Sequence, residues 1–142
     1  SYEMARRLFE QAAQQGDANA ICSLGLMYYQ GHSVEQSYEK AKEHYEQAAQ
    51  LGHSNAQFSL GFMYHNGQGV EQSYEKAKEY YEQAAQLGHP NAQYHLGRMY
   101  ATGEGVVKNE IKAHALWTLA ASQGDIDAIE MLPILEKNMK KS

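Results

Sequence analysis

The sequence predicts an all-α fold, a solenoid built from four antiparallel helix pairs. Written in blocks of 36 residues, the chain aligns with itself without a gap over 1–36, 37–72, 73–108 and 109–142, and the second and third blocks differ at ten positions. Apolar residues recur at helical spacing in each block, and glycines recur where the helices would end. Repeats of this length indicate stacked units, because one helical hairpin cannot bury its apolar face alone. We expect residues 1–142 to form a single solenoid domain.

The first helix of each block has one apolar face. In the second block Ala41, Tyr45 and Ala48 are spaced i, i+4 and i+7, and charged residues occupy the opposite side. Ser37 stands directly before this helix, where its hydroxyl can accept from an unpaired backbone N–H. Gly52 follows the helix and can supply the left-handed residue that ends it.

The second helix of each block begins after a polar residue. Asp17 and Asp125 stand at this N-cap position in the outer blocks, and His53 and His89 occupy it as weaker caps in the middle ones. Glycine recurs inside the helix, at Gly61 and its equivalents, although it costs about 1 kcal/mol there relative to alanine. Its recurrence predicts that a neighbouring helix passes too close for a side chain. The expected buried stripe in the second block is Ala56, Leu60 and Tyr64.

The fourth block departs most from the others. Leu132-Pro133 replaces the Leu-Gly pair, and Glu136 stands where the other blocks have tyrosine. Proline inside a helix removes a hydrogen bond and clashes with the preceding turn, so we expect a kink or break near Pro133. With Lys137, Lys140 and Lys141 nearby, this repeat is predicted to act as a polar C-terminal cap that stops further stacking.

Composition excludes several classes of protein. The formal net charge of −5 and the lack of a basic stripe argue against nucleic-acid binding. The apolar runs are too short to span a bilayer, so no membrane insertion is expected, and the single cysteine, Cys22, precludes an intramolecular disulfide. The first residues lack both a signal-peptide pattern and an initiator methionine, which favours a fragment. We expect a soluble monomer, with the compartment open between cytoplasm and bacterial periplasm.

A possible catalytic motif, S-x-x-K, occurs at Ser37–Lys40 and Ser73–Lys76. This spacing marks the nucleophile of penicillin-recognising hydrolases, but their S-D-N and K-T-G motifs are missing from the sequence. Asn109 holds the equivalent position in the fourth block, and asparagine can cap a helix but cannot be acylated. The seven histidines show no metal-ligand spacing. The sequence therefore favours helix caps, no cofactor or metal, and no enzymatic activity.

A longer motif repeats in the two middle blocks. K-A-x-x-x-Y-E-Q-A-A-Q-x-G followed by N-A-Q-x-x-L-G-x-M-Y-x-x-G-x-G-V is present in full in residues 40–70 and 76–106. It resembles the Sel1-like repeat family, a branch of the tetratricopeptide-like helical solenoids, and the resemblance covers essentially the whole chain. It implies a right-handed superhelix used in protein–protein interaction and assembly, frequently bacterial. Some cysteine-rich relatives carry a disulfide in each repeat, and this sequence lacks those cysteines.

The candidate binding residues are those that vary between nearly identical repeats. Stacking keeps structural positions constant, whereas an exposed face is free to differ, through drift or to match a partner. On the second helix the variable positions are spaced i, i+4, i+7 and i+8, on one helical face. Aromatic residues and arginine are enriched in binding hot spots. The candidate partner-binding residues are Tyr29, His44, Phe58, Phe62, His65, Tyr80, Tyr94 and Arg98.

The leading hypothesis is a non-enzymatic scaffold that binds a protein or peptide on its concave surface. The net negative charge favours partners with basic patches. Two alternatives are an inhibitor or immunity protein with one dedicated partner, and a hydrolase that uses the S-x-x-K serines. The near-identity of the second and third blocks fits both a recent duplication and a consensus design; in a design no natural partner need exist.

Overall fold

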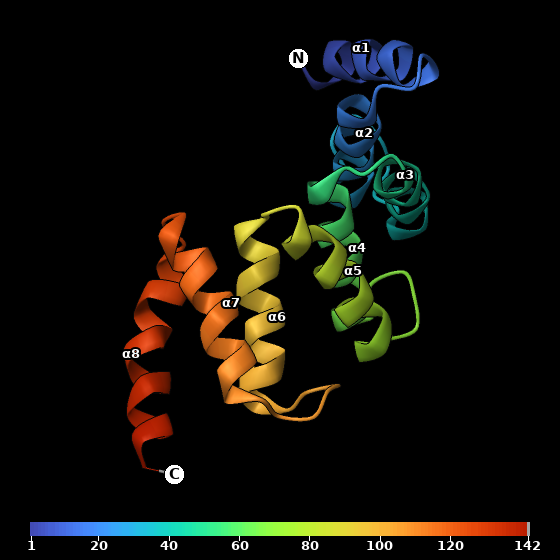
Figure 1. The fold of residues 1–142 in the computed structure, drawn as a ribbon. Helices are drawn as coiled ribbons and strands as arrows, with labels where there is room; N and C mark the ends of the chain where they lie inside the picture. The colour runs from blue at the N-terminus through green and yellow to red at the C-terminus, as the bar shows by residue number, and fades with distance from the viewer. Residues whose placement is uncertain (142) are drawn as a thin grey trace. The chain divides into compact units, whose positions relative to one another are not determined.

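The computed structural model describes residues 1–141, in which it places eight α-helices and no strand (Figure 1). The predicted all-α fold and the order of two helices per 36-residue repeat are confirmed. The helices are α1 (Tyr2–Gln14), α2 (Ala18–Gln30), α3 (Tyr38–Gln50), α4 (Ser54–Asn66), α5 (Tyr74–Gln86), α6 (Pro90–Thr102), α7 (Glu110–Ser122) and α8 (Ile126–Lys140).

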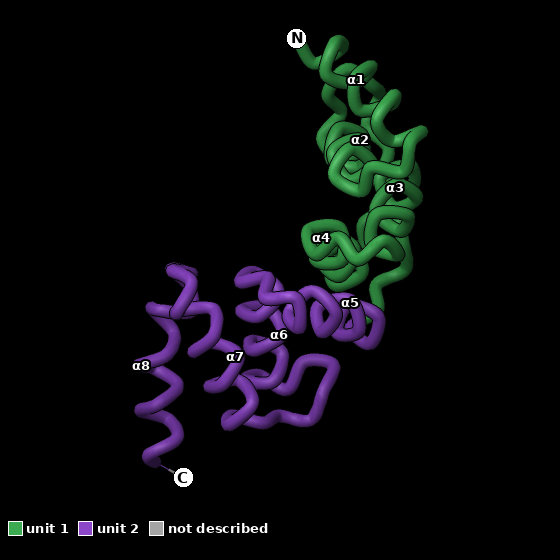
Figure 2. Tube along the Cα trace, turned by 45° about the horizontal axis from the view of Figure 1, so that its top comes forward, with its two compact units in different colours: residues 1–73 green, residues 74–142 purple. Residues whose placement is uncertain are grey.

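The chain divides into two compact units, Ser1–Ser73 and Tyr74–Ser142 (Figure 2). The first unit holds α1 to α4, and each of its helices packs against the next along the chain. The second unit holds α5 to α8 with the same sequential packing, and α6 also contacts α8. In the first unit α3 therefore packs against both α2 and α4, and in the second unit α7 packs against both α6 and α8.

The helix N-termini are capped by side chains. Asp17, Ser37 and Asn109 each accept a hydrogen bond from the backbone N–H three residues on, at 3.1, 3.1 and 3.0 Å. His53 and His89 cap α4 and α6 through Nδ1, which accepts at 3.3 and 3.2 Å. These bonds satisfy donors that a helix start leaves unpaired. The predicted caps are confirmed at these five positions.

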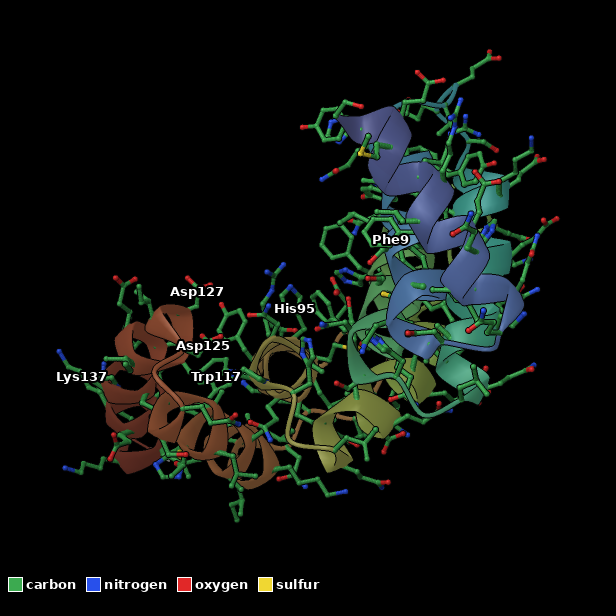
Figure 3. All side chains as sticks on the ribbon, turned by 90° about the horizontal axis from the view of Figure 1, so that it is seen from above. Phe9, His95, Trp117, Asp125, Asp127 and Lys137 are labelled. Carbon is green, nitrogen blue, oxygen red and sulfur yellow. The ribbon has the colours of Figure 1, made fainter. Side chains whose placement is uncertain are left out.

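The glycine inside the second helix marks a close approach between helices. A Cβ at Gly25 would lie 2.8 Å from the ring of Tyr45, and one at Gly97 would lie 2.5 Å from the ring of Trp117. Tyr45 and Trp117 are each 2% exposed. Figure 3 shows Trp117 extending from α7 toward α6. The predicted close packing is therefore confirmed for α2 with α3 and for α6 with α7.

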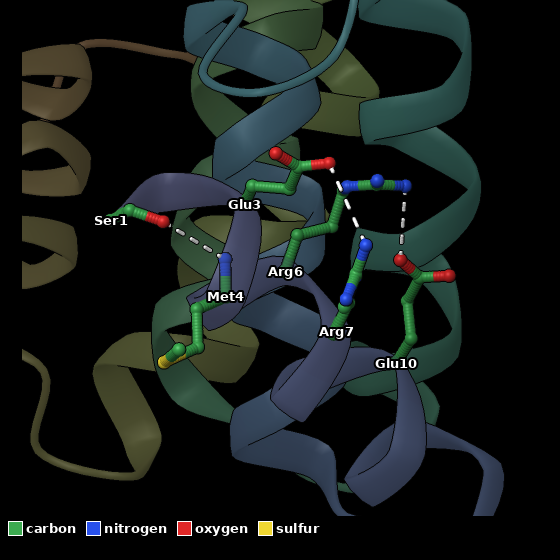
Figure 4. A network of polar contacts seen from close by, with 6 residues as sticks. All are labelled: Ser1, Glu3, Met4, Arg6, Arg7 and Glu10. Carbon is green, nitrogen blue, oxygen red and sulfur yellow. Dashed lines mark hydrogen bonds and ion pairs between the residues drawn. The ribbon is translucent and has the colours of Figure 1, made fainter.

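Polar contacts on the surface hold the first helix. Ser1 Oγ accepts from the backbone N–H of Met4 at 3.3 Å, and Arg6 pairs with Glu10 at 3.2 Å (Figure 4). No residue of α1 is buried, in contrast to the alanine and aromatic stripe of α3. Exposed ion pairs contribute between zero and about 1 kcal/mol each. Helix α1 is therefore held less firmly than the helices that follow it.

Proline at position 133 does not interrupt the last helix. Helix α8 runs from Ile126 to Lys140 with Pro133 inside it, so the break that we considered near this residue does not occur. Ala128 and Leu135 are both buried in the second unit and fix the segments on either side of the proline. The loss of one backbone hydrogen bond is too small to separate two segments that are packed in this way.

Candidate partner-binding grooves

An apolar groove lies in the first unit, and we call it the α2–α4 groove. Its volume is about 210 Å³. Three of the predicted binding residues, Tyr29, Phe58 and Phe62, come together in it from α2 and α4. The complete lining is Leu26, Tyr29, Tyr45, Phe58, Ser59 and Phe62.

The α2–α4 groove is fixed by aromatic and polar contacts. The Tyr29 hydroxyl donates to Gln68 Oε1 at 2.8 Å, and the rings of Phe58 and Phe62 are 6.2 Å apart. Tyr45, carried by α3, lies at its base, and burial raises the pKa of its hydroxyl far above the ordinary value. The lining includes no acidic or basic side chain. This groove suits an uncharged apolar side chain.

A second groove lies in the second unit, and we call it the α6–α8 groove. Its volume is about 430 Å³, and it brings together two further predicted residues, Tyr94 and Arg98. It is the repeat equivalent of the α2–α4 groove, since Trp117 stands 72 residues after Tyr45 and Ile134 stands 72 after Phe62. The complete lining is Tyr94, Arg98, Ala101, Thr102, Lys108, Glu110, Trp117, Met131, Ile134, Leu135 and Asn138.

Trp117 is locked at the base of the α6–α8 groove. Its Nε1 donates to the backbone carbonyl of Tyr94 at 2.9 Å, and the two rings stack with centroids 5.8 Å apart. Burial raises the pKa of the Tyr94 hydroxyl, the charge of Asp127 adds to that effect, and Arg98 opposes it. The groove therefore combines a rigid apolar base with charges of both signs near its edges.

The other predicted residues do not line either groove. The His44 ring stacks on Tyr28 with centroids 5.3 Å apart, and its Nδ1 lies 2.8 Å from the backbone carbonyl of Lys40. His44 therefore packs between α3 and α2. His65 on α4 and Tyr80 on α5 are half-buried and lie outside both linings. Five of the eight predicted residues thus meet in grooves.

Several groove residues were not among the predicted sites. Leu26 lies 36 residues before Phe62, and Ile134 lies 36 residues after Arg98, so the repeat period itself was the signal for both. Ile134 was missed because the fourth repeat was interpreted as a polar cap. Lys108 was missed because it follows α6 in a connecting segment, where helical spacing carries no information.

The structure describes the surroundings of two nucleophilic side chains, Ser37 and Cys22. Ser37 uses its hydroxyl as the cap of α3, accepting from the backbone N–H of Lys40. Cys22 is half-buried, and burial raises the pKa of its thiol to about 11, which disfavours the reactive thiolate.

Across residues 1–141 no group of three or more His, Cys, Asp or Glu side chains is placed to hold a metal ion. Within the same range, no helix combines the length and the apolar character needed to cross a membrane.

The repeat matches a known family. The Sel1 repeat matches residues 1–17, 18–53, 54–89 and 90–125. The chain belongs to the Sel1 repeat family. The last three matched segments keep the 36-residue period and begin at the second helix of a block, so that one Sel1 repeat holds α2 with α3 and another holds α6 with α7. Sel1 repeat proteins are generally protein-interaction scaffolds.

Solved structures of Sel1 repeat proteins are similar to this chain. A Sel1 repeat protein from Oxalobacter formigenes is 37% identical with a TM-score of 0.82, covering 88% of this chain and 94% of that one. The protective antigen c5321 of uropathogenic Escherichia coli, with an SLR fold, is 33% identical with a TM-score of 0.89. That match covers 96% of this chain but 29% of c5321, so this chain spans less than a third of that antigen.

A third similar structure is more distant. The Helicobacter pylori cysteine-rich protein B is 29% identical with a TM-score of 0.71, and the match covers 89% of this chain and 96% of that one. A comparison with curated proteins finds no match. The solved structures thus share the Sel1 repeat fold with this chain across most of its length.

Proposed function

We propose that this Sel1 repeat chain is a non-enzymatic scaffold that binds protein or peptide segments in its α2–α4 and α6–α8 grooves. One observation carries the proposal. Residues that vary between repeats meet in two equivalent grooves, and the base of each groove is a position that is aromatic in every repeat. Tyr45 and Trp117 form the constant bases, whereas the positions of Phe62 and Ile134 differ in every repeat.

The chemistry of the linings supports binding. Aromatic side chains provide large contact areas with little conformational entropy to lose, and they are common anchors of interfaces. Phe58 and Phe62 are half-buried, and Ile134 is 53% exposed, so each keeps apolar surface available to a ligand. The α6–α8 groove has a volume of about 430 Å³, within the range of about 300–1,000 Å³ that is usual for ligand pockets.

The surroundings of Ser37 and Cys22 support a scaffold without enzymatic activity. A catalytic serine needs a general base, and a catalytic cysteine needs a lowered pKa. The hydroxyl of Ser37 accepts a backbone hydrogen bond at 3.1 Å, and the pKa of Cys22 is raised. Neither residue has the environment that nucleophilic catalysis requires.

Selection from a displayed random-peptide library on the immobilised chain tests the proposal. Selected peptides are expected to lose roughly tenfold or more in affinity on Phe62→Ala or Ile134→Ala, because each change removes an apolar contact inside a groove. Leu119→Ala is the matched control, since Leu119 is 52% exposed, close to the 53% of Ile134, but lies outside both linings. Fluorescence polarisation of labelled peptides measures the affinities. Peptides that are insensitive to both groove variants, or equally sensitive to Leu119→Ala, would contradict the proposal.

A further inference from the structure

Two cations, Arg98 and Lys108, line the α6–α8 groove together with one carboxylate, Glu110. Arg98 and Lys108 are exposed, and within residues 1–141 neither takes part in an ion pair. The guanidinium of Arg98 lies near the Tyr94 hydroxyl, a neutral group. Three other cations of the chain, Arg6, Arg7 and Lys78, do form ion pairs with glutamates. The positive charges at this groove are therefore available to a ligand.

The repeat architecture does not require either cation. The residue at the Lys108 position is Gln36 or Gln72 in the preceding repeats, and each glutamine donates its side-chain amide to a backbone carbonyl of the preceding helix at 2.8 Å. Lys108 makes no such bond within the described residues. At this position the third repeat therefore has a charged ammonium group where the earlier repeats have a hydrogen bond to the backbone. The residues at the Arg98 position in the other repeats are apolar: Leu26, Phe62 and Ile134.

The carboxylates near this groove stand at helix N-termini, where the positive end of the helix dipole offsets their charge. Glu110 also lines the groove, but it stands in the first turn of α7, where the positive end of the helix dipole compensates it. Asp125 caps α8, accepting from a backbone N–H at 2.9 Å. Asp125 and Asp127 act on the Tyr94 hydroxyl, at the end of the groove nearer the starts of α6 and α8. Arg98 acts on the same hydroxyl with the opposite sign, and in the lining itself the two cations outnumber the one carboxylate, Glu110.

The middle of the α6–α8 groove is apolar. Trp117 and Leu135 are buried at its base, Met131 is half-buried, and Ile134 is 53% exposed along its side. The volume of about 430 Å³ is twice the roughly 210 Å³ of the uncharged α2–α4 groove. The α6–α8 groove can therefore hold an apolar side chain together with the polar group that follows it.

We propose that the α6–α8 groove binds an acidic peptide segment, whose carboxylates meet Arg98 and Lys108 while an adjacent aliphatic or aromatic side chain packs over Trp117 and Ile134. This inference rests on the proposed function and names the partner chemistry for one of its two grooves. Charge complementarity selects the occupant, since carboxylates are the counterpart of two unpaired cations beside an apolar base. The net charge of the whole chain favoured basic partners, but the local charge at this groove is the opposite.

An acidic peptide fits these observations better than a nucleic acid. Binding to a phosphate backbone draws on several cations spread along a surface, because each neutralised phosphate adds to the affinity. The α6–α8 groove offers two cations on a chain of net charge −5. Its apolar base also matches a side chain more closely than a phosphodiester.

The test replaces both cations with residues that the chain itself carries at equivalent positions. Arg98→Leu restores the type of Leu26, and Lys108→Gln restores the type of Gln36 and Gln72, so the fold is expected to be preserved, as circular dichroism can verify. Peptides selected from a displayed random library on the full wild-type chain are the probes. Trp117 is the single tryptophan and lines this groove, so its fluorescence reports occupancy.

We expect one class of selected peptides to be enriched in Asp or Glu next to Leu, Ile, Phe or Tyr. These peptides should change the Trp117 emission, lose roughly tenfold or more in affinity for the double variant, and bind less tightly as salt is raised. Ile134→Ala should weaken them as well, whereas Phe62→Ala, in the other groove, should leave them unchanged.

Three outcomes would overturn the inference. If peptides are sensitive to Ile134→Ala but carry no acidic residues, or bind the double variant as tightly as the wild type, the partner chemistry is wrong and the proposed function stands. If no peptide is sensitive to either groove, both fail. If a fluorescein-labelled oligo(dT) binds the wild type and loses that binding in the double variant, the occupant is a nucleic acid instead.

Discussion

The ring of Trp117 occupies the space that the missing side chain of Gly97 leaves on α6. A Cβ at Gly97 would lie 2.5 Å from Cδ1 and Nε1 of Trp117, and Gly25 stands in the same relationship to Tyr45, at 2.8 Å. The α6–α8 groove depends on this contact, because the ring that passes Gly97 also forms the base of the groove. Helix packing and the candidate binding surface therefore share one residue.

Gly97→Ala is expected to destabilise the protein by about 1–3 kcal/mol, the usual effect of forcing an extra methyl group into a packed site. Alanine is the better helix former by about 1 kcal/mol, so helix propensity alone predicts the opposite sign. Urea denaturation followed by circular dichroism measures the change. Combining the variant with Trp117→Leu should reduce the additional effect of Gly97→Ala, since the clashing ring is gone. A stabilised Gly97→Ala variant would show that the ring can move aside.

His53 joins two Sel1 repeats of the first unit through both ring nitrogens. Its Nδ1 accepts from the backbone N–H of Ala56 at 3.3 Å, and its Nε2 lies 2.7 Å from Asn19 Oδ1. A carbonyl oxygen can only accept, so Nε2 carries the proton and Nδ1 carries none. Burial lowers the pKa of His53, and the charge of Asp17 opposes that effect. The neutral ring is thus the form that caps α4.

Stability is expected to fall as the pH drops through the unfolded-state pKa of His53, about 6.5. Above that value the ring is neutral in both states and the cap contributes fully; below it the unfolded chain binds the proton first, which favours unfolding until the lower folded-state pKa is passed. His53→Asp is the matched variant, because Asp17 and Asp125 cap the equivalent helices. Urea midpoints between about pH 7.5 and about pH 5 should decline less in the variant than in the wild type. Equal declines of the urea midpoint in the two proteins would show that a group other than His53 causes the pH dependence.

Ser37→Ala is expected to lower the free energy of unfolding by about 0.5–2 kcal/mol, because α3 loses the acceptor that caps its first turn. Ser37→Asp should retain most of the stability, since aspartate caps equally well. Thermal unfolding separates the two variants. The same proteins, mixed with a chromogenic β-lactam, test the S-x-x-K motif: we expect no turnover, and turnover that disappears with Ser37→Ala would contradict a non-enzymatic scaffold.

The sequence predicted the helices because their signals are local. The caps at Ser37 and Asp125 and the close approach at Gly25 each depend on residue type at one position of a repeat, and repetition made each signal visible several times. The grooves are different, because helical spacing shows which residues share a face but does not show what that face meets. His44 was predicted because its position on the first helix varies between repeats, yet its ring stacks on Tyr28 between helices.

Charge at the α6–α8 groove could not be derived from composition. The net charge averages over the whole chain, whereas Arg98 and Lys108 lie in one groove although ten residues separate them in the sequence. Lys108 belongs to a connecting segment whose position depends on how α6 ends and α7 begins. Only the packed arrangement of α6, α7 and α8 places Lys108 in the same groove as Arg98 and the apolar base.

Pro133→Ala is expected to raise the free energy of unfolding, by up to about 3 kcal/mol, the amount by which proline is disfavoured inside a helix. Pro133 is exposed and lies within the continuous α8, so alanine adds a backbone N–H without creating a cavity. The greater freedom of the unfolded chain opposes part of this gain, by about 0.4–1 kcal/mol. Urea denaturation measures the difference, and Pro133→Gly serves as the control, because it also restores the N–H but adds backbone freedom and should gain less. A variant with alanine that is no more stable than the wild type would show that α8 already accommodates the proline ring without strain.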